Sequence, residues 1–230
     1  MTFPRTLGAL TLLACAPHSS TAQSVVVDEG TFEVKIEGRR VGEERFSIRR
    51  AGPGGEATFI ANAVIDLATG DGATELQPLL EALLPEGAAS KYQLKVTGAE
   101  AVDLTLSLAG RRFISRIRTP EGEEEREFLA RPETRILERG VAHHYYFLRN
   151  AQGGSTTPAI EPRTRTQLQL TAGAWTDEEL VLGPSRVPAR KVTFTAAGDA
   201  RTVWFDRQGR VLRVEIPASG YVAVRTDLVG

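Results

Sequence analysis

Apolar and polar residues alternate along most of the chain from Thr31 onward, and this alternation is the feature that most limits its fold. A period of two is typical of β-strands that bury one face and expose the other. The first two runs are joined by turn residues at 38–42. They predict a hairpin whose apolar positions are Phe32, Val34, Ile36, Phe46 and Ile48.

The same alternation continues in two groups of runs, which are separated by turn residues. The predicted strands are 59–67, 92–96 and 102–108, followed by 177–182, 187–195, 201–206, 211–216 and 221–225. Strands with one apolar face and almost no helix to cover it must pack on themselves. We therefore expect a mainly β protein over residues 23–230: a single antiparallel sheet, curled into a half-barrel or barrel, with one or two short helices.

The charged block from Arg111 to Phe128 predicts a hairpin with a definite register. Thr119-Pro120-Glu121-Gly122 suits a turn with Pro at its second position and Gly at its fourth. The facing pairs are then Arg118–Glu123, Arg116–Glu125 and Phe113–Phe128. Opposite charges that pair across strands indicate a solvated ladder rather than an anion site.

A second register follows from the loop Arg207-Gln208-Gly209, in which Gly suits the left-handed position of a three-residue hairpin turn. This loop predicts the facing pairs Trp204–Leu212, Thr202–Val214 and Asp206–Arg210. Trp204 is expected to be mostly buried, on the concave face of the sheet.

Three segments fit the alternation less well. Residues 76–84 have leucines at helical spacing, but Pro78 interrupts them, which favours a strand slightly. Residues 141–150 are short and aromatic, and they predict a helical turn or short helix. Residues 151–163 are rich in Gly, Pro, Ser and Thr and predict a loop.

Residues 1–22 predict an export signal. Arg5 precedes an apolar stretch from Leu7 to Ala16, and small residues then favour cleavage before Gln23. The alternative is lipoprotein processing at Cys15, because Leu12-Leu13-Ala14-Cys15 resembles a lipobox. No apolar segment reaches the roughly 20 residues that a transmembrane helix needs. The expected location is periplasmic or secreted, with lipid anchoring at Cys15 as the minority alternative.

Composition and motifs argue against several functions. The 28 basic and 29 acidic residues give a net charge of −1, which excludes the basic footprint of a nucleic-acid-binding protein. Cys15 is the only cysteine, so the predicted domain has no disulfide and no thiol nucleophile.

Candidate catalytic and metal sites are equally sparse in the sequence. Adjacent side chains such as His143 and His144 do not readily share one metal ion. There is no Gly-x-Ser-x-Gly motif, phosphate-binding loop or dinucleotide fingerprint. We expect no enzyme activity, cofactor or metal; a polar cleft holding His143 or His144 beside a carboxylate would revive the enzyme hypothesis.

Two segments of the chain resemble known proteins. They are FEVKIEG at 32–38 with Val41-Gly42, and WFDRQGRVLRVEIP at 204–217. Both look like uncharacterised bacterial periplasmic proteins with curled sheets, which are similar in architecture to the lipoprotein-carrier half-barrels of the LolA/LolB type. The resemblance implies a curled sheet and supplies no catalytic residue. The lid helices of the carriers proper have no counterpart in this sequence.

The aromatic residues are the remaining candidates for a binding site. A curled sheet encloses space, and an apolar interior suits an apolar guest. The predicted lining residues are Phe59, Tyr92, Tyr145, Tyr146, Trp175 and Trp204, with Tyr145 and Tyr146 at the rim.

Two functions are consistent with these features. The leading hypothesis is an exported, non-enzymatic β protein that binds a lipid, an acyl chain or another amphiphile in its curled sheet. The alternative is a cell-envelope structural or protein-interaction module with a fully packed interior, whose exposed sheet edges pair with a partner protein. A cavity lined by aromatic residues is expected for the first and not for the second.

Overall fold

The computed structural model of the chain describes residues 24–52, 57–70, 72–98 and 100–228. Strand makes up 68% of the structure and helix 5%, which confirms the mainly β prediction. Among the described residues, the helical ones form two short 3₁₀ segments, η2 (His143–Leu148) and η3 (Pro217–Ser219). The predicted signal peptide, the cleavage point before Gln23 and the lipobox Cys15 lie outside the described residues.

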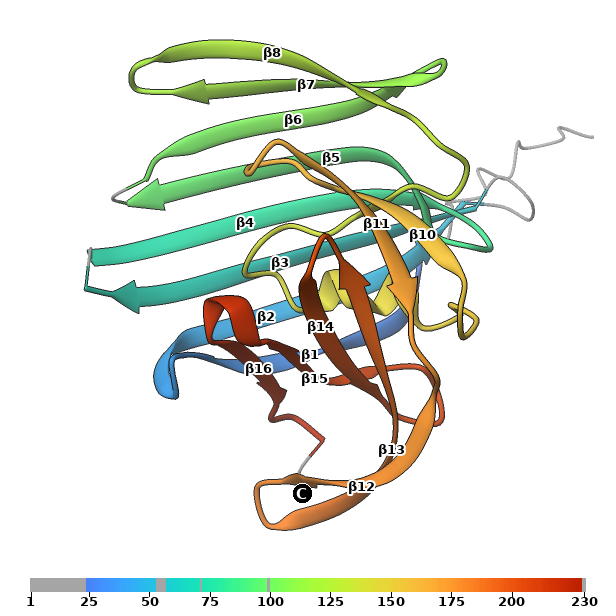
Figure 1. The fold of residues 1–230 in the computed structure, drawn as a ribbon. Coiled ribbons are helices and arrows are strands. Elements are labelled where there is room, and N and C mark those ends of the chain that lie inside the picture. The colour runs from blue at the N-terminus through green and yellow to red at the C-terminus, as the bar shows by residue number, and fades with distance from the viewer. Residues whose placement is uncertain (1–23, 53–56, 71, 99, 229–230) are drawn as a thin grey trace, which may run out of the picture.

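Sixteen strands form one large sheet (Figure 1). Its order is β8-β7-β6-β5-β4-β3-β2-β1-β16-β15-β14-β13-β11-β10-β9, and β12 pairs with β13 beside this path. The pairs are antiparallel except for β9 with β10. The strand bounds are β1 (Val25–Ile36), β2 (Arg39–Ala51), β3 (Thr58–Thr69), β4 (Gly72–Leu83), β5 (Ala88–Gly98), β6 (Val102–Ala109), β7 (Arg112–Thr119), β8 (Gly122–Leu129), β9 (Arg135–Ile136), β10 (Thr156–Glu161), β11 (Thr166–Ala172), β12 (Thr176–Leu182), β13 (Ser185–Ala196), β14 (Asp199–Phe205), β15 (Val211–Ile216) and β16 (Tyr221–Arg225).

The sheet curls back on itself without closing. In Figure 1, β10 and β11 cross in front of β4 and β5. The β10–β11 hairpin also contacts β8, because Nε2 of Gln167 donates to the carbonyl of Leu129 at 2.9 Å and Arg165 pairs with Glu124 at 2.7 Å. Just before β9, the carbonyl of Thr134 accepts a hydrogen bond from the backbone N–H of Ala89 on β5 at 2.8 Å. The concave face therefore encloses one main hydrophobic core, whose residues come from most of the sequence, from Phe32 on β1 to Ala223 on β16.

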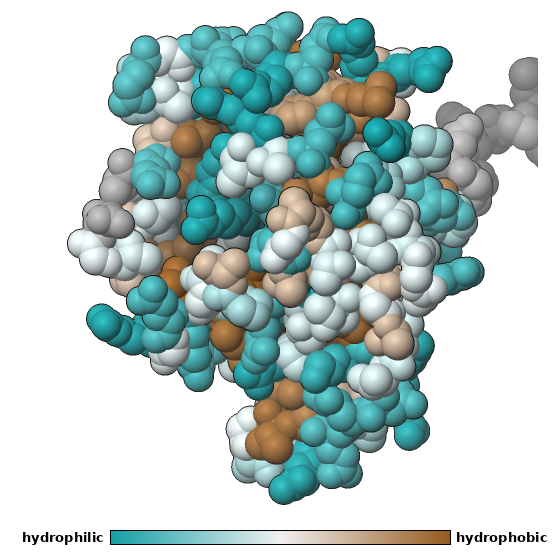
Figure 2. Space-filling model, in the orientation of Figure 1, coloured by the Kyte–Doolittle hydropathy of each residue, from teal (hydrophilic) through white to brown (hydrophobic). Residues whose placement is uncertain are grey.

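The predicted hairpin of β7 and β8 is confirmed in its register. Arg118 lies opposite Glu123, Arg116 opposite Glu125, and Phe113 opposite Phe128. The charged side chains are exposed, and the sheet edge that β7 and β8 form is covered by hydrophilic residues in Figure 2. Charges on an edge strand oppose unwanted pairing with other chains.

Residues 76–84 lie mostly in β4, so the preference for a strand is confirmed. Pro78 sits in this central strand although it lacks an N–H donor. The β3–β4 pairing stops after Asn62–Leu79 and resumes at Ile65–Leu76, so Pro78 falls in an interruption of the ladder. The predicted short helix within 141–150 is also confirmed, as η2.

Two local predictions are wrong. Residues 151–163 are not only a loop, because they contain β10, which pairs with β11 and β9. Trp204 faces Arg213 rather than Leu212, and Thr202 faces Glu215 rather than Val214. The pairing shifts between Trp204 and Phe205, so an extra residue is present on β15, as in a β-bulge.

Next to this bulge, a second and smaller hydrophobic cluster lies on the face of the sheet opposite the main core. Trp204 is 5% exposed, so its burial is confirmed, but the prediction of the concave face is wrong. This outer cluster consists of Leu180, Leu182, Ala189, Trp204 and Leu212. It joins the β12–β13 hairpin to β14 and β15.

Candidate functional site

The segment η2 lies inside the curled sheet (Figure 1), and all six of its side chains are buried. It supplies His143, His144, Tyr145, Tyr146, Phe147 and Leu148 to the interior. A short 3₁₀ segment rich in aromatic residues thus occupies the space that the curled sheet encloses.

Glu44 of β2 holds the start of η2. It is fully buried, and its carboxylate accepts hydrogen bonds from the backbone N–H of Ala142 at 2.7 Å and of His143 at 2.8 Å. The same carboxylate lies 2.7 Å from Nδ1 of His143. Three polar contacts satisfy a carboxyl group that would be costly in an apolar interior without them.

The strand pattern explains why Glu44 points inward. It precedes Phe46 and Ile48 at intervals of two, so all three lie on the buried face of β2. Glu44 was not among the residues predicted to form a site, although the alternation along β2 is sufficient to place it on the buried face.

His143 and His144 lie with ring centroids 4.7 Å apart, at 75° to each other. His144 Nδ1 accepts a hydrogen bond from the backbone N–H of Glu138 at 3.2 Å, so its proton lies on Nε2. Burial, followed by the neighbouring His143, holds the pKa of His144 well below its usual value, and His144 is neutral. Among the described residues, no three His, Cys, Asp or Glu side chains are grouped to hold a metal ion.

His143 does lie beside a carboxylate, which meets one part of the condition for the enzyme hypothesis; the other part was a polar cleft around the pair. Both His143 and Glu44 are completely buried, however, and neither lines any of the five principal pockets of the described structure. None of these five pockets therefore gives access to the pair.

Glu138 is the second buried carboxyl group near η2. Its Oε1 accepts hydrogen bonds from the backbone N–H of Arg139 at 3.0 Å and from Nε of Arg163 at 3.1 Å. Burial raises its pKa to about 7, against the opposing effect of the Arg163 guanidinium. This carboxyl group therefore titrates near neutral pH.

The predicted lining residues divide into three groups. Phe59, Tyr92, Tyr145 and Tyr146 meet in the main core and are at most 4% exposed. Trp175 is partly buried at the edge of this core, where its ring lies 5.6 Å from that of Phe205. Trp204 is in the outer cluster, so the structure does not bring it to the others.

These aromatic residues fill the interior rather than line a hollow. None of the five principal pockets is lined by Phe59, Tyr92, Tyr145, Tyr146 or Trp204. Trp175 lines a shallow pocket of about 170 Å³ together with Arg149 and Arg190.

One pocket, of about 390 Å³, does reach η2, and we call it the η2 pocket. Its apolar wall consists of Pro85 from the β4–β5 turn together with Phe147 and Leu148 from η2. Its polar wall includes Arg135 of β9, and residues from the start of β10 complete the rim. The pocket therefore joins solvent to the apolar end of the buried segment.

Arg135 is unusual because it is 94% buried without a close ionic partner. Its Nε donates to the carbonyl of Phe147 at 3.0 Å, and Nη1 donates to the carbonyl of Glu133. Its nearest carboxylate oxygen, on Glu133, lies 3.8 Å from Nη2. Burial is the main cause of a lowered pKa at Arg135. No sequence pattern marks Arg135, because β9 is too short to show alternation.

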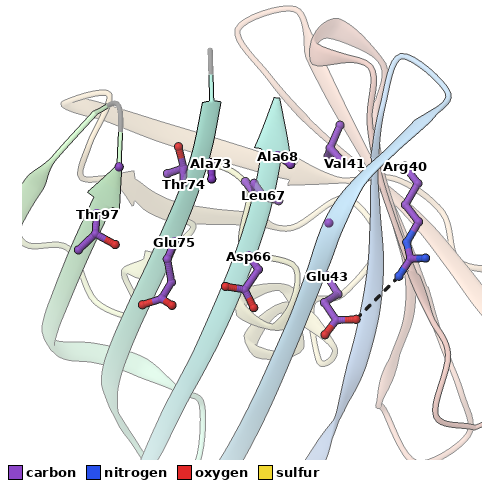
Figure 3. A pocket seen from close by; sticks show the side chains of 12 residues that line it. Arg40, Val41, Glu43, Asp66, Leu67, Ala68, Ala73, Thr74, Glu75 and Thr97 are labelled. Atoms are coloured by element: carbon purple, nitrogen blue, oxygen red, sulfur yellow. Dashed lines mark ion pairs between the residues drawn. The ribbon is translucent and has the colours of Figure 1, made fainter. Parts of the chain in front are cut away.

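A wider groove of about 670 Å³ lies over the ends of β2 to β5 (Figure 3). Glu43, Asp66 and Glu75 extend into it from three neighbouring strands, and Arg40 forms an ion pair with Glu43. Arg45 also pairs with both Glu43 and Asp66. Of these three ion pairs, Arg45–Asp66 joins β2 to β3, and the other two lie within β2.

Comparison with known proteins identifies no relative: no protein family, curated protein or solved structure matches the chain. The resemblance to periplasmic curled-sheet proteins therefore stays a prediction. In the described residues, no helix has the length and apolar character needed to span a membrane.

Proposed function

We propose that this protein is an exported, non-enzymatic binding protein that takes an amphiphilic ligand at the η2 pocket. The observation that carries the proposal is that apolar residues of the buried segment, Phe147 and Leu148, border a pocket of ligand size beside polar groups. Pockets of about 300–1,000 Å³ with an apolar wall and a few placed polar groups are typical of small-molecule sites.

The geometry also defines how such a ligand would bind. Its apolar part would contact Pro85, Phe147 and Leu148, and its polar head would face Arg135 and the rim. The interior beyond the pocket is filled by η2, which Glu44 holds in place. A ligand would reach Tyr92 and Tyr145 only if η2 moved, so the site favours short or partly bound chains over a fully enclosed acyl chain.

Trp175 provides a direct test, because its indole N–H donates at 2.8 Å to the carbonyl of Ala151, which lines the η2 pocket. In a Trp204→Phe background, Trp175 is the only tryptophan. We expect lysophospholipids or fatty acids to change its fluorescence saturably.

A matched pair of variants assigns the signal to the pocket. Thr157 lines the η2 pocket, so Thr157→Phe should obstruct binding, whereas Thr176→Phe on the exposed β12 should not. The absence of a saturable change with every amphiphile, together with a native mass spectrum without retained ligand, would contradict the proposal.

The second candidate is a cell-envelope interaction or structural module. The filled interior favours it, because η2 is buried along its whole length. A partner would then add a strand to an exposed edge, such as that of β12. The same titration separates the two functions, since this module requires no saturable binding of amphiphiles.

A further inference from the structure

We infer that the η2 pocket recognises a zwitterionic head group, whose anionic part pairs with Arg135 and whose ammonium group lies against Glu86 and Glu133. This inference rests on the proposed function and names the ligand class of the same pocket. It follows from the positions of the charged side chains: the cation Arg135 lies in the wall of the pocket, and the carboxylates Glu86 and Glu133 lie at its rim.

The first step concerns the wall. The guanidinium group of Arg135 has five N–H donors. Among the described residues, the carbonyl of Phe147 accepts a hydrogen bond from Nε, and the carbonyl of Glu133 accepts one from Nη1. Its closest carboxylate is 3.8 Å away, on a Glu133 side chain that is 60% exposed. A buried cation with unfilled donors favours an anionic group with two oxygens, such as a phosphate, which guanidinium binds in a bidentate manner.

The second step concerns the rim. Glu86 and Glu133 both line the pocket and are both exposed, and both carboxylates act electrostatically on Arg135. Arg149 is the nearby cation that opposes them, but it lines a different pocket, and its guanidinium stacks on the Tyr146 ring at 3.8 Å. The rim is therefore acidic, while the wall is basic.

The two steps together define the ligand. A purely anionic head would meet Arg135 but would also approach two carboxylates, which repel it. A neutral head would leave Arg135 without an anion. A phosphoethanolamine head satisfies both parts, because its phosphate faces the guanidinium and its primary ammonium donates hydrogen bonds to carboxylates.

The experiment compares lauroyl amphiphiles that differ only in their heads, using the mature full-length protein and the Trp175 signal. The probes are lauroyl lysophosphoethanolamine, lauroyl lysophosphoglycerol and monolauroylglycerol. We expect the zwitterion to bind about tenfold more tightly than the neutral lipid, as for one added charge-assisted pair. Glycerophosphoethanolamine, which has no acyl chain, tests whether a free soluble head group is the true ligand.

Variants show whether Arg135 recognises the head group or only stabilises the fold. Arg135→Gln should remove the preference for phosphate heads, so that lysophosphoethanolamine and monolauroylglycerol bind with similar affinities. Arg131→Gln is the matched control, since Arg131 is exposed and near in sequence. If Arg135→Gln does not fold, Glu86→Gln and Glu133→Gln decide: each should weaken lysophosphoethanolamine several-fold and strengthen lysophosphoglycerol, because a rim charge attracts one head and repels the other.

The outcomes are distinguishable. If none of the lipids binds, the proposed function fails. If all three lipids bind equally, or the rim variants change both phospholipids in the same direction, amphiphile binding survives and the head-group inference is wrong. If glycerophosphoethanolamine binds as tightly as its lauroyl counterpart, the zwitterionic head is confirmed, and the ligand is a soluble molecule rather than a lipid.

Discussion

The main core and the outer cluster are held together by different kinds of contact. The main core surrounds η2 and buries polar groups, among them Glu44, His143 and His144. The outer cluster contains only apolar side chains and Trp204, whose indole N–H donates to Glu178 at its margin. Apolar burial stabilises both regions, but in the main core directional hydrogen bonds also fix where η2 lies.

This difference has consequences for how the two regions respond to change. Removing one partner of a buried hydrogen bond leaves the other partner unsatisfied. This is costly for a buried carboxylate or its donors, because the surrounding medium has a low dielectric constant. An apolar cluster loses only contact area and leaves a cavity. Three substitutions test the comparison, beginning with the largest expected effect.

Glu44→Ala should destabilise the protein most. The change leaves the N–H groups of Ala142 and His143 and the His143 ring without their acceptor. We expect a loss of about 5 kcal/mol in the free energy of unfolding, measured by urea denaturation, since each unsatisfied buried group costs about 1–3 kcal/mol. A loss below about 1 kcal/mol would show that Glu44 does not fix η2.

Trp204→Ala should cost less, about 3–4 kcal/mol, because it removes a large apolar side chain from the outer cluster. The effect should be local. Amide hydrogen exchange should accelerate in β12, whose strand pairing in the described sheet is with β13 alone and whose packing depends on Trp204, and remain slow in β2. Equal acceleration in β2 would mean that the two regions unfold as one unit.

Glu138 should make stability depend on pH, with the smallest of the three effects. Its pKa is about 7 in the folded protein and near its ordinary 4.5 when unfolded. Its contribution is complete below pH 4.5 and is lost as the pH rises to 7, because the unfolded chain then releases a proton that the folded protein retains.

The expected loss at Glu138 is up to about 3 kcal/mol, at 1.4 kcal/mol per pKa unit. Glu138→Gln keeps a carbonyl acceptor for the Arg139 N–H but cannot titrate. The difference in unfolding free energy between the variant and the wild type should therefore change between pH 4.5 and 7. A constant difference across that range would show that Glu138 stays ionised in the folded state.

Much of the sheet followed from local sequence. The alternation at Phe32, Val34 and Ile36 and the turn at 119–122 predicted strands and a register that the structure confirms. Such features depend on contacts between residues close in the chain, where turn geometry sets the pairing.

The wrong predictions concern segments whose structure depends on contacts between residues far apart in the chain. The bulge in β15 changed the partner of Trp204, and the β12–β13 hairpin buried it on the outer face. Parallel pairing of β9 with β10 turned part of a predicted loop into strand. For the candidate site, the aromatic residues were predicted, but Arg135 was not, since its burial depends on the β4–β5 turn and on η2.

The pairing of β1 with β16 affects how the chain is made. The two strands are neighbours near the middle of the sheet, yet Tyr221 is synthesised roughly 185 residues after its partner Ile36. At about 5–20 residues per second, β1 presents an unpaired edge for roughly 10–40 seconds of synthesis. During this interval the half-finished sheet is a template for pairing with other chains. A holding chaperone that covers β1 until β16 emerges would therefore raise the yield of folded protein more than one acting on the completed chain.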